Sequence, residues 1–240
     1  MLSIVVVAKG LWPVTERCLE TLCDTVDHEI EIVYVDNGTP PGHDSLEKFM
    51  RWSTSRKGLR VQTIMYPPTK MMFMGKEILV GLPLPSCWNA GAALTATTGN
   101  TLLIINNDLV FKSTGWYSSV NAALSEEGVG IVGLYAMSWH NASFIQGSFL
   151  AMRRTTFQRV GLFNEWLEFT CEDVDFCFRA QKLGYRIKML PELHDKVIHL
   201  DNTTRNSYPD NRTYFQYKAH ESRLRFCYLY SELGSVDIHD

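Results

Sequence analysis

The sequence lacks several patterns that would narrow its function at once. None of its six cysteines forms a Cys-x-x-Cys pair, and none has the Cys/His spacing of a zinc site. No apolar run approaches the length of a membrane span, and no basic region precedes an apolar core at the start of the chain. We therefore expect reduced thiols in a cytoplasmic protein with no signal peptide and no transmembrane segment.

An excess of charge of one sign is also missing. The 240 residues have a formal net charge of -3 and a pI near 6.2, so the chain has no broad attraction for nucleic acid or anionic membranes. Hydrophobic residues make up 45% of the chain and charged residues 20%, which is ordinary for a globular protein. The chain is long enough to bury a proper core.

The most informative apolar run extends from Thr101 to Ile105 and ends in Asn106, Asn107 and Asp108. Apolar residues without alternation predict a strand buried on both faces, as in a parallel sheet covered by helices. Ligands collect beyond the carboxyl ends of such strands, so Asp108 is placed to hold a divalent cation against a phosphate. Taken alone, the triplet is better explained as a polar turn that closes a core strand.

A second acidic residue ends another expected strand. A buried strand at Ile4 to Ala8, a helix from Pro13 and a strand at Glu31 to Val35 predict the β-α-β opening of a nucleotide-binding sheet. Asp36 follows that last strand directly, with turn residues behind it. It either faces a ligand or closes an Asx turn on its own backbone, and the residues alone leave both open.

Two segments follow that have a structural and a functional interpretation. The connection from Pro67 to Pro85 is long and rich in methionine, which favours a hydrophobic plug over the sheet, with a flexible lid as the alternative. A helix of small residues begins at Trp88 and Asn89 and stops near Gly99. It could bring its first amides near a diphosphate, although tight packing on the sheet would explain its composition equally well.

The second half of the chain has a different character. Phe144 to Met152 predicts one strand, and Glu172 with Asp173 heads a helix that Gly184 ends. Acidic residues in a first turn are commonly stabilised by the helix dipole, by about 0.3 to 1 kcal/mol. The functional alternative is that the same dipole keeps Asp173 ionised at neutral pH, ready to accept a proton.

The last third ends in a histidine, a polar loop and a helix. His199 follows an apolar stretch, at the place where a cation held by Asp108 would need a nitrogen ligand. The loop from Asp201 to Arg212 either folds over a ligand or is a mobile connection. We expect the helix from Tyr214 to Leu233 to pack on the domain, with docking to a membrane surface or a partner as the alternative.

Four separated motifs resemble those of the inverting, GT-A fold glycosyltransferases of family 2, over about residues 3 to 200. The first two motifs are Ile4 to Ala8 followed by Val35 to Gly38, and Trp88 to Gly91 ahead of Leu103 to Asp108. The others are Arg153 to Glu165, and Glu172 to Arg179 followed by Gly184 to Arg186. Each is weak alone, but their order and spacing are specific and favour the functional interpretations above.

The resemblance implies a fold and a set of roles. The fold would be α/β, a single GT-A domain with a Rossmann-like, mostly parallel sheet flanked by helices and a C-terminal helix. Asp36 would accept a hydrogen bond from the nucleobase, and Asp108 would bind the metal in the family's Asp-x-Asp motif, with His199 completing the site. Asp173 would be the general base, with Glu172 beside it in the acceptor site. The residues expected around the nucleotide are Ala8, Lys9, Asp36, Asn89, Asn106 and Asn107.

The resemblance also implies the reaction and the domain layout. A nucleotide-diphospho-sugar, most simply a UDP-sugar, would be the donor, Mn2+ (favoured) or Mg2+ the cofactor, and a hydroxyl group the acceptor. Glycans, lipid-linked sugars, proteins and modified nucleic acids all remain open as acceptors, as does the oligomeric state. We expect a near-minimal domain at residues 1–200 without a membrane anchor, with a nucleotide half at 1–110 and an acceptor half at 111–200. Residues 201–240 would form a mobile loop and a helix packed on it.

One departure from the family pattern keeps two alternatives open. Asn106 stands where the motif has its first carboxylate, so we expect weaker metal binding. A catalytically silent nucleotide-sugar or glycan binding module is therefore one alternative. The other is a nucleotidyltransferase of related fold, which is disfavoured because Lys9, Gly10 and Leu11 replace the Gly-rich, Arg-containing loop such enzymes use.

Overall fold

The computed structural model of the chain describes residues 1–96, 99–139, 142–200 and 211–231. Its centre is a seven-stranded sheet in the order β12-β8-β11-β6-β1-β2-β3. Four neighbouring strands are parallel, and they are β1 (Leu2–Ala8), β2 (Ile30–Asn37), β3 (Arg60–Tyr66) and β6 (Thr101–Asn106). Of the other three, β11 (Phe149–Arg153) is antiparallel to β6 and to β8 (Val129–Gly133), while β12 (Arg186–Met189) is parallel to β8. The expected mostly parallel sheet is confirmed.

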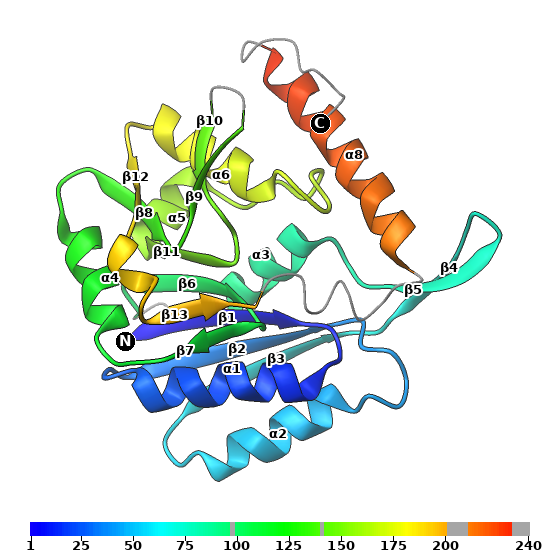
Figure 1. Ribbon diagram of the computed structural model, residues 1–240, viewed down its shortest axis with the longest axis horizontal. Coiled ribbons are helices and arrows are strands. Elements are labelled where there is room, and N and C mark those ends of the chain that lie inside the picture. The colour runs from blue at the N-terminus through cyan, green and yellow to red at the C-terminus, as the bar shows by residue number, and fades with distance from the viewer. Residues whose placement is uncertain (97–98, 140–141, 201–210, 232–240) are drawn as a thin grey trace.

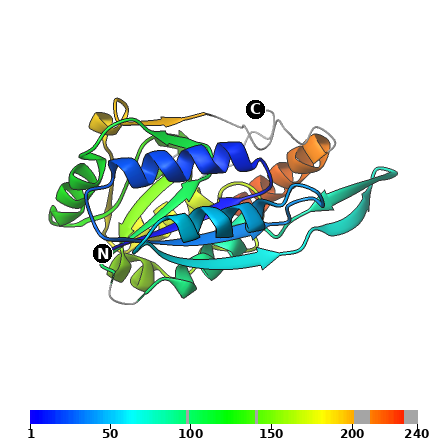
Figure 2. The same ribbon diagram turned by 90° about the horizontal axis from the view of Figure 1, so that it is seen from below.

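Helices cover both faces of this sheet (Figures 1 and 2). One face packs against α1 (Trp12–Thr25), α2 (Ser45–Ser55) and α4 (Trp116–Ser125). The other packs against α3 (Leu84–Leu94), α5 (Arg154–Val160) and α6 (Glu172–Lys182). The protein therefore has three layers, with a separate hydrophobic core on each side of the sheet.

The side chains of the parallel strands explain why the sheet is covered twice. In β6, Leu103 and Ile105 belong to one core, whereas Leu102 and Ile104 belong to the other. Successive strand residues point to opposite faces, so a continuous apolar run supplies both cores. On the second face α3 approaches closely, because a Cβ added at Gly91 would lie 2.4 Å from Val5 Cγ1.

Three small two-stranded sheets lie beside the main one. They are formed by β7 (Leu109–Phe111) with β13 (Val197–His199), by β9 (Ala136–Trp139) with β10 (Ala142–Ile145), and by the hairpin of β4 (Thr69–Phe73) and β5 (Lys76–Val80). A short 3-10 helix, η1 (Pro191–Leu193), precedes β13. The β7–β13 pair matters most here, because it carries the chain's late segment back to the end of β6.

The methionine-rich connection is the hairpin β4–β5, and it extends away from the body of the protein (Figure 1). Met72 and Met74 are 67% and 77% exposed, so the expected hydrophobic plug over the sheet is wrong. Alternation explains this arrangement, because Phe73 on the inner face packs on Tyr214 and Tyr217 while Met72 on the opposite face meets solvent.

The single strand expected from Phe144 to Met152 is also wrong. The chain breaks between β10 and β11 at residues 146–148, where Ser148 O accepts a hydrogen bond from Asn106 N. The two pieces then join different sheets. This break places Gln146 and Gly147 beside the end of β6.

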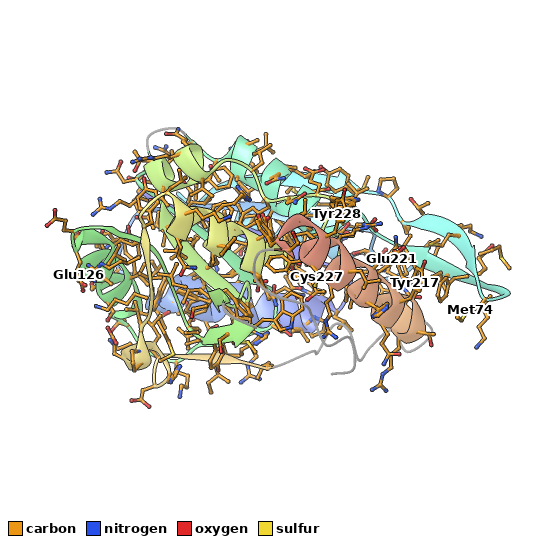
Figure 3. The ribbon with its side chains drawn as sticks, turned by 90° about the horizontal axis from the view of Figure 1, so that it is seen from above. Met74, Glu126, Tyr217, Glu221, Cys227 and Tyr228 are labelled. Carbon is orange, nitrogen blue, oxygen red and sulfur yellow. The ribbon has the colours of Figure 1, made fainter. Side chains whose placement is uncertain are left out.

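The C-terminal helix α8 (Arg212–Leu229) is present as expected and packs on the domain. Phe226 is buried against Trp139, and Phe215 stacks on Phe169 with ring centroids 4.7 Å apart. Figure 3 shows Tyr217, Glu221 and Tyr228 along this helix and Met74 at the hairpin tip. Among the described residues, no helix combines the length and apolarity needed to span a bilayer.

Candidate active site at the ends of the parallel strands

Three neighbouring strands end at the same edge of the sheet and bring their polar residues together. Ala8 pairs with Asp36 across β1 and β2, and Val7 pairs with Asn106 across β1 and β6. Because these strands are parallel, the residues that follow them emerge side by side. This is the edge at which the sequence places its candidate ligands.

A cavity of about 380 Å³ opens at this edge. Its walls come from the strand ends, the connection between β5 and α3, the break before β11, the segment before α6, the end of β13, and α8. The lining residues are Val7, Ala8, Lys9, Asn37, Val80, Gly81, Leu82, Pro83, Leu84, Asn106, Asn107, Asp108, Gln146, Glu168, Phe169, His199, Tyr214, Phe215 and Lys218. This volume is within the range of small-molecule sites.

Asp108 and His199 form a buried polar pair in the wall. Antiparallel pairing of β7 with β13 sets His199 opposite Leu109, and Leu200 N donates to Asp108 O. The His199 Nε2 and Asp108 Oδ1 atoms are 3.2 Å apart, and only 6% and 5% of the two side chains is exposed. A buried carboxylate beside an imidazole is a donor pair that suits Mn2+ or Zn2+.

Asp108 and His199 alone do not complete the coordination of a divalent cation, so a bound ligand would have to supply further ligand atoms. Among the described residues, no group of three or more His, Cys, Asp or Glu side chains gathers around one point. Asn106 adds an uncharged amide at the cavity wall. An ion bound by Asp108 and His199 would therefore take its remaining oxygen ligands from a bound diphosphate or from water.

The contacts of the Asn107 side chain indicate a structural role. Its side chain is 4% exposed, and its Nδ2 donates to Thr15 Oγ1 at 2.8 Å. This bond connects the turn after β6 to helix α1. The Asn107 side chain thus helps to fix the position of its neighbour Asp108.

Asp36 and Asn37, at the end of β2, fix the backbone around the cavity. Asp36 Oδ1 accepts a hydrogen bond at 3.1 Å from Thr39 N, three residues along the chain, so the carboxyl bonds to its own loop, and burial raises its pKa. Asp36 is absent from the lining residues. Asn37 does line the cavity, and its amide binds both Leu82 N (2.7 Å) and Leu82 O (3.0 Å). A Cβ at Gly81 would lie 2.4 Å from Asn37 Oδ1, so this close approach requires glycine.

Lys9 lies at the same end of the cavity. Its Nζ donates to Leu79 O at 2.9 Å, and Asn211 Nδ2 donates to the same oxygen at 2.7 Å. The Phe215 ring centroid lies 6.0 Å from Lys9 Nζ. Burial lowers the pKa of Lys9 to about 8. The first strand, the hairpin and the start of α8 therefore meet at a single carbonyl group.

Asn89 lies outside the cavity lining. Its Nδ2 donates to Phe163 O and Glu165 Oε1, and its Oδ1 accepts from Phe163 N, each at 2.9 Å. These bonds join α3 to the segment before α6. The structure thus gives this side chain a packing role, and its expected contact with the nucleotide stays a prediction.

The Glu172–Asp173 pair begins α6 and contacts the segment 146–147 through Gly147. Asp173 Oδ2 accepts from Gly147 N and Asp173 Oδ1 from Val174 N, both at 2.8 Å. Burial raises the pKa of Asp173, although these two N–H groups act in the opposite direction. Glu172 is 6% exposed, and burial followed by the charge of Asp173 raises its pKa well above its ordinary value. Burial therefore outweighs the lowering expected from the helix dipole.

The rest of this motif is structural. Asp175 is 1% exposed and binds Arg179 Nε at 2.8 Å, while Tyr230 OH donates to its other oxygen at 2.5 Å. Arg179 also donates to Val160 O and Leu162 O. These bonds fix α6 against α5 and α8, and so hold the helix end that carries Asp173.

Sequence reasoning missed the wall formed by Glu168 and α8. Lys218 Nζ lies 2.9 Å from Glu168 Oε2 and 3.0 Å from Glu221 Oε2, and Arg225 Nη1 lies 2.8 Å from Glu168 Oε1. Phe215 stacks beside this network on Phe169. The only signal in the sequence was the mixture of aromatic and basic residues in the helix, which did not show which of them face the cavity.

Sequence comparison identifies the family. Residues 83–208, more than half of the chain, match the profile described as "Glycosyl transferase family group 2". The chain belongs to this family. It is also 33% identical over 84 residues to the rhamnosyltransferase WbbL of Escherichia coli (strain K12), a match that covers 35% of this chain and 28% of that protein. The chain therefore spans little more than a quarter of this relative's length.

Solved structures confirm a GT-A-like fold for this family member. A mannosyltransferase of Pyrobaculum calidifontis, solved with GDP-Man and Mn2+, superposes with a TM-score of 0.64 at 15% identity, over 93% of this chain and 64% of that one. GalNAc-T7, solved with UDP, GalNAc and Mn2+, gives 0.63 at 15% identity, over 80% of this chain and 42% of that one. TarS residues 1-349 of S. aureus give 0.56 at 14% identity, over 79% and 57%.

In this glycosyltransferase family member the expected site residues divide into two groups. The cavity lining contains Ala8, Lys9, Asn106, Asn107, Asp108 and His199, whereas Asp36, Asn89, Glu172 and Asp173 are outside it. Asp173 is nevertheless one hydrogen bond from the wall, because its partner Gly147 adjoins the lining residue Gln146. The carboxylates expected for the metal and for the base thus belong to one region.

Proposed function

We propose that this chain is a metal-dependent inverting glycosyltransferase that moves a sugar from a nucleoside diphosphate donor to a hydroxyl acceptor. The observation that carries the proposal is the pair of Asp108 and His199, 3.2 Å apart in a cavity at the ends of parallel strands. A second carboxylate, Asp173, accepts a hydrogen bond from the N–H of Gly147, the residue after the lining residue Gln146. Both halves of a displacement reaction therefore have a candidate residue.

Asp108 and His199 would hold the cation on the donor side. The bound ion would neutralise the negative charge of the diphosphate as the bond to the sugar breaks. Asn107 Nδ2, through its bond to Thr15, keeps the turn that carries Asp108 in place. These residues would thus serve the donor, and their loss should abolish nucleotide binding that depends on metal.

Asp173 would act on the acceptor side as the general base. Two N–H groups, from Gly147 and Val174, orient its oxygens. Burial raises the pKa of Asp173, which makes it a stronger base than a solvent-exposed aspartate. Removal of the acceptor proton by Asp173 and attack from the side opposite the diphosphate would invert the anomeric centre.

Relatives support a nucleotide-sugar donor but differ in its identity. The Pyrobaculum enzyme binds GDP-Man with Mn2+, GalNAc-T7 binds UDP with Mn2+, and the E. coli relative is a rhamnosyltransferase. We take UDP as the first nucleotide to test and Mn2+ as the first metal. Asn106, which replaces a carboxylate in the motif, favours a catalytically silent binding module as the second candidate.

The test is a thermal-shift panel of UDP, GDP, dTDP and CDP, each with and without Mn2+. A nucleotide at about 100 times its Kd adds roughly 2.7 kcal/mol, or about 5 to 10 °C for a chain of this size. We expect a shift with at least one nucleotide, only with Mn2+, in the wild type and in the exposed control Asp195→Ala. Asp108→Ala should lose it.

The outcomes separate the alternatives. No shift with any nucleotide, or an undiminished shift in Asp108→Ala, would overturn the proposal. A shift that is not followed by slow hydrolysis of the corresponding nucleotide sugar would favour the silent binding module. Inversion is then checked by the anomeric configuration of the product.

A further inference from the structure

Helix α1 carries a row of small polar side chains along its buried side. The row consists of Thr15, Cys18, Thr21 and Thr25, which are three or four positions apart and therefore share one side of the helix. Three of them are buried, and Thr21 is half-buried. Polar groups in such a place need hydrogen-bond partners, and all four find one in the segment 106–116, which includes β7 and lies beside the helix (Figure 1).

Two side chains of this row contact the turn that carries Asp108. Thr15 Oγ1 accepts a hydrogen bond from Asn107 Nδ2 at 2.8 Å, and the Cys18 thiol donates to Asn106 O at 3.8 Å. A thiol is a weak donor, so the bond to the Thr15 hydroxyl is the stronger of the two. Helix α1 thus binds both of the residues that lead directly into the expected metal ligand.

The other two side chains of the row contact the chain beyond this turn. Thr21 Oγ1 accepts from Phe111 N, and Thr25 Oγ1 accepts from Trp116 Nε1, both at 3.1 Å. Each hydroxyl donates its own proton to the helix carbonyl four positions earlier, from Thr21 to Arg17 O at 2.8 Å and from Thr25 to Thr21 O at 2.7 Å. These hydroxyl oxygens are therefore oriented as acceptors toward the neighbouring segment.

The Thr15 contact acts on the part of the turn that the strands do not pair. Leu200 N donates to Asp108 O at 3.0 Å where β13 pairs with β7, and this bond holds the backbone on the far side of the turn. The bond to Thr15 Oγ1 instead holds the side chain of Asn107, which is 4% exposed. Because Asn107 and Asp108 are adjacent, a rotation of the first would change the direction of the second.

We propose that Thr15 is a positioning residue for the metal site, and that its hydroxyl, acting through the Asn107 amide, sets the direction of the Asp108 carboxylate. The proposal rests on the function proposed above. It goes beyond that function by assigning part of the site's geometry to α1, a helix described over its whole length that contributes no residue to the cavity lining. Thr15 is 0% exposed, so it acts on a ligand only through its neighbours.

The size of the expected effect follows from how metal ligands are oriented. Loss of a group that orients a ligand typically lowers metal affinity by about 10- to 100-fold. Thr15→Val keeps the shape of the side chain but removes the acceptor of the Asn107 amide. We therefore expect Mn2+-dependent nucleotide binding to be about 10 to 100 times weaker in Thr15→Val. Thr15→Ser keeps the hydroxyl and should restore binding to near the wild-type value.

The matched control is the same substitution at the other end of the row. Thr25→Val removes the acceptor of Trp116 Nε1, so it should lower the Tm much as Thr15→Val does, yet leave nucleotide binding unchanged. Calorimetric Kd values would be measured for UDP, GDP, dTDP and CDP at a Mn2+ concentration well below the wild-type midpoint. A loss of metal affinity then appears in full in the Kd of the nucleotide.

Hydrogen exchange adds a measurement that needs no ligand. In the protein without metal or nucleotide, amide exchange in a peptide covering residues 106–109 should be faster in Thr15→Val than in the wild type. Thr25→Val should leave this peptide unchanged, because its contact lies at Trp116. Unchanged exchange of this peptide in Thr15→Val would contradict the proposed control of the turn.

The binding results separate this inference from the proposed function. An unchanged nucleotide Kd in Thr15→Val, or equal losses in Thr15→Val and Thr25→Val, overturns the role of Thr15. The proposed function survives either result if binding still requires Asp108. Absence of Mn2+-dependent binding of all four nucleotides to the wild type overturns the proposed function and this inference with it. If thermal unfolding shows that a valine variant fails to fold, Thr15→Ala with Thr25→Ala as its control replaces the valine pair.

Discussion

Two acidic sites have different surroundings, one in the cavity wall and one beside it. Asp108 has an imidazole nitrogen 3.2 Å away at the end of a strand. Glu172 and Asp173 lie together at the start of a helix, and burial raises both of their pKa values. A carboxylate beside a nitrogen ligand is suited to hold a cation, whereas a buried carboxylate with a raised pKa is suited to take a proton. If the proposed roles hold, the surroundings of each carboxylate, more than its residue type, determine which role it takes.

The largest expected effect comes from removing the proposed base. Asp173→Asn keeps the size of the side chain but cannot accept the acceptor proton, so transfer should fall by about 10² to 10⁴. Nucleotide binding should be unchanged, because Asp173 is outside the cavity lining. Steady-state transfer and calorimetric binding measure the two effects. Full transfer in this variant would remove Asp173 from its role.

The next effect tests the backbone that holds Asp173. A Cβ at Gly147 would lie 2.6 Å from the Trp88 ring, so Gly147→Ala should cost about 1 to 3 kcal/mol of stability. For this chain length that is a fall in Tm of roughly 2 to 12 °C. Trp88→Phe removes the outer ring atoms, so adding it to Gly147→Ala should recover part of the loss. Equal Tm values for Gly147→Ala and the wild type would show that this contact is relaxed in solution.

A smaller effect, opposite in sign, is expected at Glu172. The folded state raises its pKa, so the unfolded chain loses this proton first as pH rises, and the wild type is destabilised above the ordinary value of 4.5. Glu172→Gln should therefore raise stability at pH 7 and should gain little at pH 4. Chemical denaturation at both pH values measures the gain. The exposed control Glu47→Gln should stay within about 0.5 kcal/mol, and a Glu172→Gln variant less stable than the wild type at pH 7 would contradict the burial argument.

A further effect of pH concerns Lys9, in the cavity wall. Its pKa falls from 10.5 to about 8 in the folded protein, so the unfolded state binds the proton more tightly between these values. Stability should then rise with pH from about 8 toward 10.5 through this group. Lys9→Met lacks this titrating group, so the free energy of unfolding of the wild type should rise relative to that of the variant between about pH 8 and pH 10.5. The same difference in free energy of unfolding between Lys9→Met and the wild type at pH 7 and at pH 10 would argue against a buried ammonium.

The central sheet could be predicted from the sequence because its middle strands are buried on both faces. Leu102 to Ile105 supply alternate residues to the two cores, which is what a strand covered on both faces requires. The position of Asp108 followed from the end of that strand. Its pairing with His199 was expected from the resemblance, and it depends on a short sheet between segments about ninety residues apart, which local patterns do not report.

The parts that could not be predicted depend on tertiary contacts. Phe144 to Met152 is apolar enough for one strand, yet residues up to Ile145 pair with β9 and residues from Phe149 pair with β6. The sequence left open whether the Asp36 carboxyl bonds to its own backbone or faces a ligand, and only the structure shows the bond from Thr39 N. The role of Leu79 was invisible, because a backbone carbonyl has no signature in the sequence.

That carbonyl has a consequence for the order in which the protein matures. Leu79 O accepts from Lys9, 70 positions earlier, and from Asn211, 132 positions later. During synthesis all strands of the main sheet emerge from the ribosome before α8, the helix that completes this corner of the cavity. The core can form while the chain is emerging, but the cavity gains its last wall only after α8 has emerged, so the sheet could be compact before the cavity is complete.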